Sequence, residues 1–244
     1  MIYASASQSK KPVVMKLITV AGPPSSGKTS VILKTIAALG LPEGSVGVVK
    51  FDSLTSFDHQ RYEEQRIPNQ TAFAGNICPD HFFVSNVERA VEWGIKKGLS
   101  ILITESAGLC NRCSPYVNAI LSVCVIDNLS GANTPRKIGP MLKYADIVVV
   151  TKGDIVSQAE REIFAFNIRE VNTSTTVLFV NGITGQGALM LARHWQDALD
   201  IQTLRDRKLR FTMPAAICSY CTGETLIGEM YQIGMVKRME FDDV

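Results

Sequence analysis

The stretch GPPSSGKT, Gly22 to Thr29, lies between the apolar run KLITVA and the helix-like segment SVILKTIAALG. A glycine, four residues and then Gly-Lys-Thr, between a strand and a helix, is the spacing of a phosphate-binding loop rather than of an ordinary Gly/Ser turn. Backbone N–H groups hold phosphates in such loops, while Lys28 neutralises the β- and γ-phosphates and the Thr29 hydroxyl binds Mg²⁺. The predicted nucleoside triphosphate site comprises Gly22, Pro23, Pro24, Ser25, Ser26, Gly27, Lys28, Thr29 and Ser30.

Short apolar runs alternate with helix-length segments along most of the chain. Val/Ile/Leu runs of this length are typical of strands buried on both faces of a parallel sheet. The predicted fold class is therefore α/β, a mostly parallel sheet flanked by helices, with ligands beyond the carboxyl ends of the strands. The strand runs are KLITVAG, SVGVVKFD, LSILITESAG, SVCVIDNLSG, ADIVVVTKGD and TVLFVNGITG. Helices are expected over residues 27–39, 84–97, 114–122, 138–144, 157–171 and 187–199.

The same alternation predicts how the chain is divided. Residues 1–14 are expected to form a flexible tail, and residues 15–200 the nucleotide-binding domain. From residue 201 the α/β pattern stops, which leaves a short cysteine-bearing C-terminal appendage over residues 201–244.

Composition excludes several classes of partner. The 25 basic and 23 acidic residues give a formal charge of +2 without a long basic block, so no nucleic-acid partner is expected. No apolar run approaches the length of about 18 residues that a membrane span needs, and the N-terminus lacks the apolar core of a secretory signal. A cytoplasmic protein is expected, in which six cysteines indicate metal or redox chemistry more than disulfides.

The segment TKGD, at the end of a predicted strand, indicates which base is bound. The Asp154 carboxylate is suited to accept hydrogen bonds from the N1–H and amino group of guanine, a pattern that adenine does not offer. Thr151 takes the place of Asn in the usual Asn-Lys-x-Asp motif, which leaves the strictness of GTP over ATP open. GTP is the predicted nucleotide, with a base site made by Thr151, Lys152, Asp154, Asn181 and Gly182.

Six segments in order resemble one family. They are the phosphate loop, ICPDH (77–81), TESAG (104–108), VIDNLSGANTPRKIGP (125–140), DIVVVTKGD (146–154) and NGITGQG (181–187). Together they resemble the nickel-handling P-loop GTPases, namely the urease accessory and hydrogenase maturation GTPases with their cobalamin-synthesis relatives, over about residues 15–199. The resemblance implies a SIMIBI-type P-loop fold and a GTPase that dimerises when loaded and moves metal to a target enzyme.

Catalytic and Mg²⁺-binding residues are expected where the strands end. The Glu105 carboxylate is placed to hold the hydration shell of Mg²⁺, and Gly108 to turn its N–H toward the γ-phosphate. Asp52 resembles the family's switch aspartate, which helps to place Mg²⁺ or the attacking water, although Asp58 competes for this role. The predicted catalytic residues are Lys28, Asp52, Glu105 and Gly108, and the predicted Mg²⁺ residues are Thr29, Asp52 and Glu105.

A transition-metal site is predicted from Cys78 and His81 in ICPDH, which offer a soft sulfur and an imidazole suited to nickel or zinc. Two ligands do not complete a four-coordinate site, but a symmetric dimer supplies the pair twice. The urease-type pattern is Cys-Pro-His, so Asp80 is an insertion relative to it. The alternative for Cys78 is a buried thiol.

Two Cys-x-x-Cys pairs extend the metal hypothesis. Cys110 and Cys113 follow Gly108 directly, and Cys218 and Cys221 lie in the predicted appendage. Four such thiols hold zinc or an iron–sulfur cluster if the fold brings them together. One shared site, two sites and no site all stay open, and reversible dithiol chemistry is the alternative.

Two function hypotheses remain from the sequence. In the first, GTP hydrolysis drives the delivery of a metal or an iron–sulfur cluster to a client metalloenzyme, through a nucleotide-loaded homodimer and with other maturation factors as partners. In the second, the protein is a nucleotide-gated metal or redox binding module that docks on a partner, and hydrolysis is incidental. A phosphoryl-transferring kinase is a weaker third possibility, because no acceptor-binding lid is evident.

Overall fold

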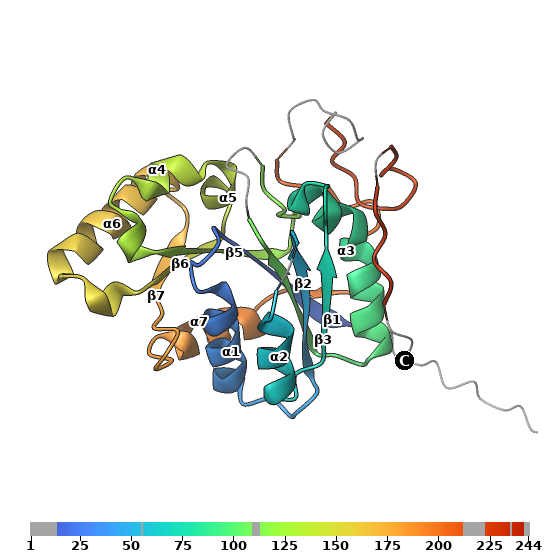
Figure 1. Ribbon diagram of the computed structural model, residues 1–244, viewed down its shortest axis with the longest axis horizontal. Helices are drawn as coiled ribbons and strands as arrows, with labels where there is room; N and C mark the ends of the chain where they lie inside the picture. Colours follow the sequence, from blue (N-terminus) through green and yellow to red (C-terminus); the bar gives the residue numbers. More distant parts are fainter. Residues whose placement is uncertain (1–13, 55, 109–112, 212–222, 235, 242–244) are drawn as a thin grey trace, which may run out of the picture.

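A central sheet organises the chain in the computed structural model, which describes residues 14–241 apart from 55, 109–112, 212–222 and 235. Within these residues seven parallel strands lie in the order β3-β2-β4-β1-β5-β6-β7, and a short β8 pairs antiparallel with β1 (Figure 1). The strands are β1 (Met15–Ala21), β2 (Val46–Asp52), β3 (Asn69–Phe73), β4 (Ile101–Ser106), β5 (Leu121–Asp127), β6 (Ile147–Thr151), β7 (Thr176–Phe179) and β8 (Asp200–Ile201). The predicted α/β class is confirmed.

Helices cover both faces of this sheet (Figure 1). One face is packed by α1 (Lys28–Leu39), α2 (Asp58–Glu64) and α7 (Ala188–Gln196), and the other by α3 (Pro79–Lys96), α4 (Thr134–Ile138), α5 (Pro140–Lys143) and α6 (Gln158–Val171). Two 3₁₀ turns, Asn128–Ser130 and Gly153–Ile155, follow β5 and β6. In the described part of the chain, no helix combines the length and the apolar character that crossing a membrane requires.

Burial on both faces explains the continuous apolar runs. Successive side chains of a strand point to opposite faces, so Leu17 packs in the core beneath α3 while Ile18 packs in the core beneath α1 and α7. Leu102 and Ile103 of β4 divide in the same way. A strand covered on both sides therefore shows no polar alternation until its carboxyl end, where the site residues begin.

The segment after β8 packs onto the α3 face of the sheet. Leu204, Leu209, Ile227 and Met239 belong to the same core cluster as the α3 side chains. The described residues beyond 201 thus add apolar surface to the main core, and the predicted domain boundary at residue 201 stays a prediction.

The predicted helix over residues 114–122 is wrong. Tyr116 and Val117 are fully buried in an irregular segment, Val117 forms an antiparallel bridge with Leu209, and β5 begins at Leu121. The Arg210 guanidinium donates hydrogen bonds to the carbonyl groups of Val117 and Ile120, which stabilises this non-helical path. These partners are about 90 residues away in the sequence, so local helix propensity did not decide the outcome.

Candidate functional site

The phosphate loop connects β1 to α1, as predicted, and its backbone is held by close contacts. A Cβ atom on Gly22 would lie 2.1 Å from the carbonyl oxygen of Val125 in β5, so only glycine fits there. Gly27 has φ 89°, in the left-handed region that favours glycine, directly before α1. The Lys28 ammonium donates hydrogen bonds of 2.9 Å to the carbonyl oxygens of Gly22 and Pro23. Burial lowers the pKa of Lys28, and the negative charge of Glu105 opposes that shift.

Glu105 connects the phosphate loop to the neighbouring strand. Its carboxylate is 1% exposed, and Oε1 accepts hydrogen bonds from the Thr29 hydroxyl at 2.9 Å and from the Lys50 ammonium at 3.2 Å. Its Oε2 accepts a 2.8 Å hydrogen bond from the Tyr62 hydroxyl, which comes from α2. Burial and the Glu105 charge raise the pKa of Tyr62 well above its usual value, so this phenol stays a hydrogen-bond donor.

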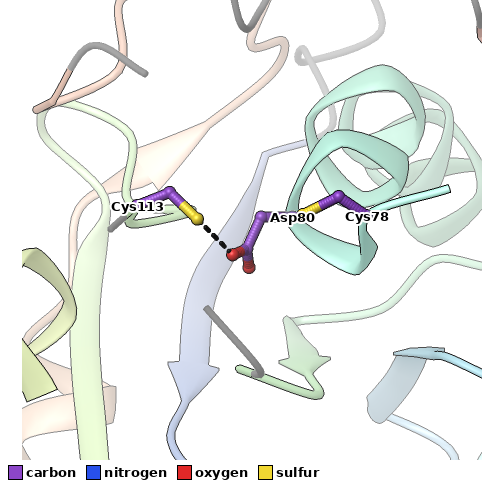
Figure 2. A group of neighbouring side chains, drawn as sticks. All are labelled: Cys78, Asp80 and Cys113. Carbon is purple, nitrogen blue, oxygen red and sulfur yellow. Dashed lines mark hydrogen bonds between the residues drawn. The ribbon is translucent and has the colours of Figure 1, made fainter. Parts of the chain in front are cut away.

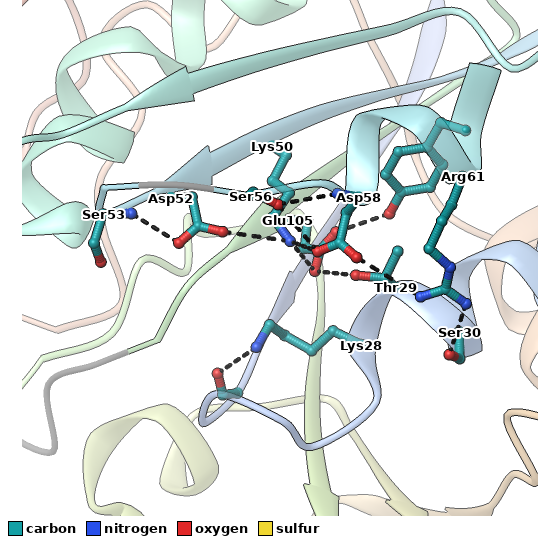
Figure 3. Close-up of polar contacts among 12 residues, drawn as sticks. Lys28, Thr29, Ser30, Lys50, Asp52, Ser53, Ser56, Asp58, Arg61 and Glu105 are labelled. Atoms are coloured by element: carbon teal, nitrogen blue, oxygen red, sulfur yellow. Dashed lines mark hydrogen bonds and ion pairs between the residues drawn. The ribbon is translucent and has the colours of Figure 1, made fainter.

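Two aspartates complete the cluster around Lys50 (Figure 3). Asp58, in the first turn of α2, forms an ion pair with the Lys50 ammonium, and the Asp52 carboxylate lies 3.5 Å from it. Burial alone would lower the pKa of Lys50, but the charges of Glu105, Asp58 and Asp52 outweigh it and raise that pKa. The sequence analysis treated Asp52 and Asp58 as alternatives for the switch aspartate, whereas the structure places both carboxylates next to the Lys50 ammonium.

These side chains line a cavity of about 350 Å³ beside the phosphate loop. Its lining residues are Pro24, Ser25, Gly27, Lys28, Thr29, Ser30, Lys50, Asp52, Asp58, Arg61, Glu105 and Ala107. The Arg61 guanidinium reaches the loop from α2 and donates a 3.0 Å hydrogen bond to the Ser30 hydroxyl. Six of the nine predicted phosphate-site residues line this cavity together with Asp52 and Glu105, whereas Gly22, Pro23 and Ser26 do not. Lys50, Arg61 and Tyr62 are functional candidates that the sequence analysis missed.

Gly108 lies against the phosphate loop. It has φ 58°, and a Cβ atom there would lie 2.3 Å from the carbonyl oxygen of Gly22. A glycine is therefore required by both backbone conformation and space. The predicted contact of its N–H with a γ-phosphate stays a prediction.

Part of the predicted base site lies at a second cavity, of about 360 Å³, and its role in binding a base stays a prediction. Asp154 and Asn181 line it, and Asn181 accepts hydrogen bonds from the backbone N–H groups of Ile183 and Thr184, which fix the loop after β7. Gly182 lies against Ser30, where an added Cβ would be 2.9 Å from the serine Cβ. The Gly182 contact places the loop after β7 next to the first turn of α1.

Thr151 and Lys152 point toward the phosphate loop. The Thr151 hydroxyl is buried and donates a 2.7 Å hydrogen bond to the carbonyl oxygen of Ser26, and the Lys152 ammonium donates one of 3.0 Å to that of Ser25. Thr151 is not among the residues that line the base cavity. It therefore ties the end of β6 to the phosphate loop, and its contact with a base stays a prediction.

A second cluster gathers Cys78, Asp80 and Cys113 (Figure 2), and it contacts Ser106, the residue after Glu105 in β4. Their sulfur and carboxylate atoms all lie within 4.8 Å of one another. Cys78 is the N-cap residue of α3, and Asp80 follows in its first turn. The Cys113 thiol lies 2.8 Å from Asp80 Oδ2 and donates to it, and the Ser106 hydroxyl lies 3.3 Å from Oδ1.

Hydrogen bonding in this cluster favours a thiolate at Cys78. Hydrogen bonding with Cys113 lowers the pKa of Cys78 to about 7, against the effects of burial and of the Asp80 charge. Burial raises the pKa of the Asp80 carboxyl group, which is 1% exposed. Two sulfur atoms and a carboxylate are a donor set for a borderline divalent metal.

The cluster differs from the predicted pair of Cys78 and His81. Asp80, which the sequence analysis treated as an insertion, gathers with the two cysteines, whereas His81 is not a member of the cluster and its role as a ligand stays a prediction. His81 is partly buried, and burial lowers its pKa. Cys110, Cys218 and Cys221 lie outside the described residues, so their predicted roles stay predictions.

We expect the Cys78 thiol to react with iodoacetamide as a low-pKa thiol. Its alkylation rate should reach half its maximum near pH 7 and fall about tenfold for each unit below, because only the thiolate reacts. Peptide-resolved mass spectrometry gives this rate separately for each cysteine. Replacing Cys113 with alanine should move the midpoint upward, since that removes the hydrogen bond that lowers the pKa of Cys78. An unchanged midpoint would contradict this origin of the shift.

Comparison with known proteins identifies the family. The CobW/HypB/UreG nucleotide-binding domain matches residues 16–179. The chain belongs to the CobW/HypB/UreG family. The predicted resemblance to the nickel-handling P-loop GTPases is thereby confirmed.

Within the CobW/HypB/UreG family, the chain is 46% identical over 227 residues to the uncharacterized protein MJ0120 of Methanocaldococcus jannaschii, covering 93% of this chain and 97% of that protein. It is 27% identical over 193 residues to the urease accessory protein UreG of Haloquadratum walsbyi, covering 70% of this chain and 89% of that protein. The crystal structure of HypB from Helicobacter pylori in complex with nickel superposes with a TM-score of 0.59 at 16% identity, covering 75% and 86% of the two chains.

The residues that the sequence analysis missed in this CobW/HypB/UreG member left weak signals. Lys50 is a charged residue that interrupts the apolar run VGVVKF before Asp52, which marks a position with a buried partner. Arg61 and Tyr62 lie in the polar helix α2, which lacks the length of a strong helical pattern. Asp80 directly precedes His81, and the sequence analysis assigned the role of metal ligand to that histidine instead.

Proposed function

We propose that this protein binds and hydrolyses GTP to drive delivery of a transition metal, with nickel or zinc as cargo, during maturation of a client metalloenzyme. The observation that carries the proposal is the placement of two clusters at the end of one strand. In β4, Glu105 contacts the phosphate-loop residue Thr29, and the next residue, Ser106, contacts Asp80 of the cysteine cluster. Adjacent strand residues face opposite sides of a sheet, so a shift of this strand end moves both clusters together.

The nucleotide side supports GTP hydrolysis as follows. The phosphate loop and the Lys28 ammonium hold the phosphates, and Asp154 selects guanine through its carboxylate. Asp52 or Asp58, both in the cavity wall, orients the attacking water. Hydrolysis is expected to be slow in the isolated protein, because such switches often need a partner to complete the catalytic set.

Magnesium fits the oxygen donors that converge beside the phosphate loop. Thr29, Glu105, Asp52 and Asp58 offer a hydroxyl and three carboxylates, which are the hard ligands that Mg²⁺ prefers. When bound with nucleotide, Mg²⁺ neutralises charge on the β- and γ-phosphates.

The cysteine cluster supports the cargo assignment. Cys78, Asp80 and Cys113 provide three donors, and a fourth comes from the substrate metal's own water, from Cys110, or from a second copy of the chain. The H. pylori HypB structure contains nickel by its description, which favours nickel among the borderline metals. An iron–sulfur cargo rests on Cys110, Cys218 and Cys221, which lie outside the described residues.

The metal site is tested with matched cysteine variants. We expect Cys78→Ala and Asp80→Asn to weaken nickel or zinc binding at least tenfold in competition titrations with a chromophoric chelator, because each removes one of three donors. Cys124→Ala is the control, since Cys124 is fully buried in another core cluster and burial raises its pKa to about 12. Equal affinity in Cys78→Ala and Cys124→Ala would refute the assignment.

The enzymatic proposal and a nucleotide-gated binding module differ in whether metal release requires hydrolysis of the nucleotide. Metal-loaded protein is mixed with GTP and Mg²⁺ or with a non-hydrolysable analogue, and release to a chelator is followed against phosphate production. Release that needs hydrolysis supports the proposal. Equal release with the analogue supports the binding module, in which hydrolysis is incidental.

The assembly is expected to be a nucleotide-loaded homodimer, which brings two copies of the cysteine cluster together. Light scattering with GTP, GDP and no nucleotide measures this directly. A mass that stays monomeric in all three conditions would remove the dimer from the proposal.

A further inference from the structure

Lys50 occupies the centre of the carboxylate cluster. Its ammonium lies 3.2 Å from Glu105 and 3.5 Å from Asp52 and forms an ion pair with Asp58, and the residue is 5% exposed. Glu105 Oε1, which accepts its hydrogen bond, also accepts the one from Thr29. The lysine therefore uses the same oxygen atoms that we assign to Mg²⁺.

The position of Lys50 follows from the register of the sheet. Lys50 of β2 and Glu105 of β4 are paired residues on adjacent parallel strands, so their side chains lie side by side on one face. Asp52, two residues further along β2, points to the same face. An ordinary surface ion pair is worth little, but this one is buried and shared among three acids.

The other cations of the cavity do not have this role. The Lys28 ammonium donates to loop carbonyls. The Arg61 guanidinium donates to the Ser30 hydroxyl and lies 3.7 Å from Asp58, but its side chain is 45% exposed and it pairs with that one carboxylate, whereas the buried Lys50 pairs with all three. Three cationic and three anionic side chains line the cavity, so their formal charges cancel before any ligand enters. A divalent cation that arrives alone meets carboxylates that already have a cationic partner.

We propose that Lys50 is a resident counter-ion that keeps divalent cations out of the carboxylate cluster until a nucleotide brings its phosphates. This inference deepens the proposed function and rests on it, because it explains how a metal-carrying protein avoids trapping its cargo at hard oxygen ligands. The negative charge of a triphosphate gives the Lys50 ammonium a second anionic partner, and the carboxylates are then available to a divalent cation. Entry of the cation is thus coupled to nucleotide rather than to the concentration of free metal.

The test measures Mn²⁺ binding by electron paramagnetic resonance in nucleotide-free protein. Lys50→Met should bind Mn²⁺ at least tenfold more tightly than the unmodified protein, because an unneutralised carboxylate cluster attracts the cation. Lys50→Gln keeps a hydrogen-bond donor for Glu105 and Asp58, so it tests the same loss of charge if the methionine variant does not fold. Lys16→Met is the matched control, since Lys16 lies in β1 and pairs with Asp200.

The outcomes separate this inference from the proposed function. The inference would be overturned if the Mn²⁺ affinities of the nucleotide-free proteins lay within twofold of one another for the unmodified protein, Lys50→Gln and Lys50→Met. An equal gain in Mn²⁺ affinity in Lys16→Met would also overturn it. A tenfold gain confined to the Lys50 variants, which shrinks when GDP is added, supports it. Failure to bind or hydrolyse GTP would sink the proposed function but would leave the nucleotide-free titrations readable.

Discussion

Gly108→Ala should weaken GTP binding at least about a hundredfold, the largest effect that we expect from a single methyl group in this protein. The new Cβ would lie 2.3 Å from the carbonyl oxygen of Gly22, which is backbone of the phosphate loop and does not move without changing that loop. The left-handed φ of 58° adds strain of about 1–3 kcal/mol for a non-glycine residue. Titration with a fluorescent GTP analogue measures the affinity.

Gly98→Ala is the matched control for this variant. Gly98 has a similar φ of 70°, but an added Cβ meets no atom within 4 Å. It should lower the free energy of unfolding by only about 1–2 kcal/mol and leave GTP affinity unchanged. If the two variants lose stability equally in denaturant and both bind GTP normally, the close approach of Gly108 to Gly22 is not required for GTP binding.

Lys28→Met should reduce GTP hydrolysis at least about a hundredfold, the usual cost of removing one electrostatic stabiliser of a transition state. In the nucleotide-free protein, however, the Lys28 ammonium donates hydrogen bonds to the neutral carbonyl oxygens of Gly22 and Pro23, and burial lowers its pKa. Methionine has a similar length without the charge. Thermal unfolding without nucleotide should therefore show equal or greater stability.

The two measurements on Lys28→Met work together. Lost hydrolysis with unchanged or higher stability assigns the lysine to phosphate chemistry, because a structural lysine would cost stability when removed. Asp58→Asn should instead lower the stability of the nucleotide-free protein, since Asp58 neutralises the buried Lys50 and that lysine lowers the pKa of Asp58 against the effect of burial. A loss of more than about 2 kcal/mol in the free energy of unfolding of Lys28→Met would contradict our interpretation, as that is a typical cost of breaking a structural network.

Local features made the nucleotide side predictable. The residues Gly22 to Thr29 are contiguous, and both their spacing and their flanking strand and helix can be read from the sequence. Glu105 and Asp52 end buried strands, and carboxyl ends of parallel strands meet at one edge, so their convergence also follows from the pattern. The helix predicted over residues 114–122 is wrong for the converse reason, because the partners of this segment come from the distant C-terminal segment.

The sequence alone determined the α/β class, the phosphate loop, the family and the residues that follow its strands. Tertiary structure decided the partners of those residues. The register of β2 against β4 places Lys50 beside Glu105, and the start of α3 places Cys78 and Asp80 beside Cys113, which is 35 residues away from Cys78 in the chain. A motif reflects the spacing of residues along one segment. Strand register and helix packing instead join distant segments through backbone hydrogen bonds and a shared core, and these contacts are not encoded in any single segment.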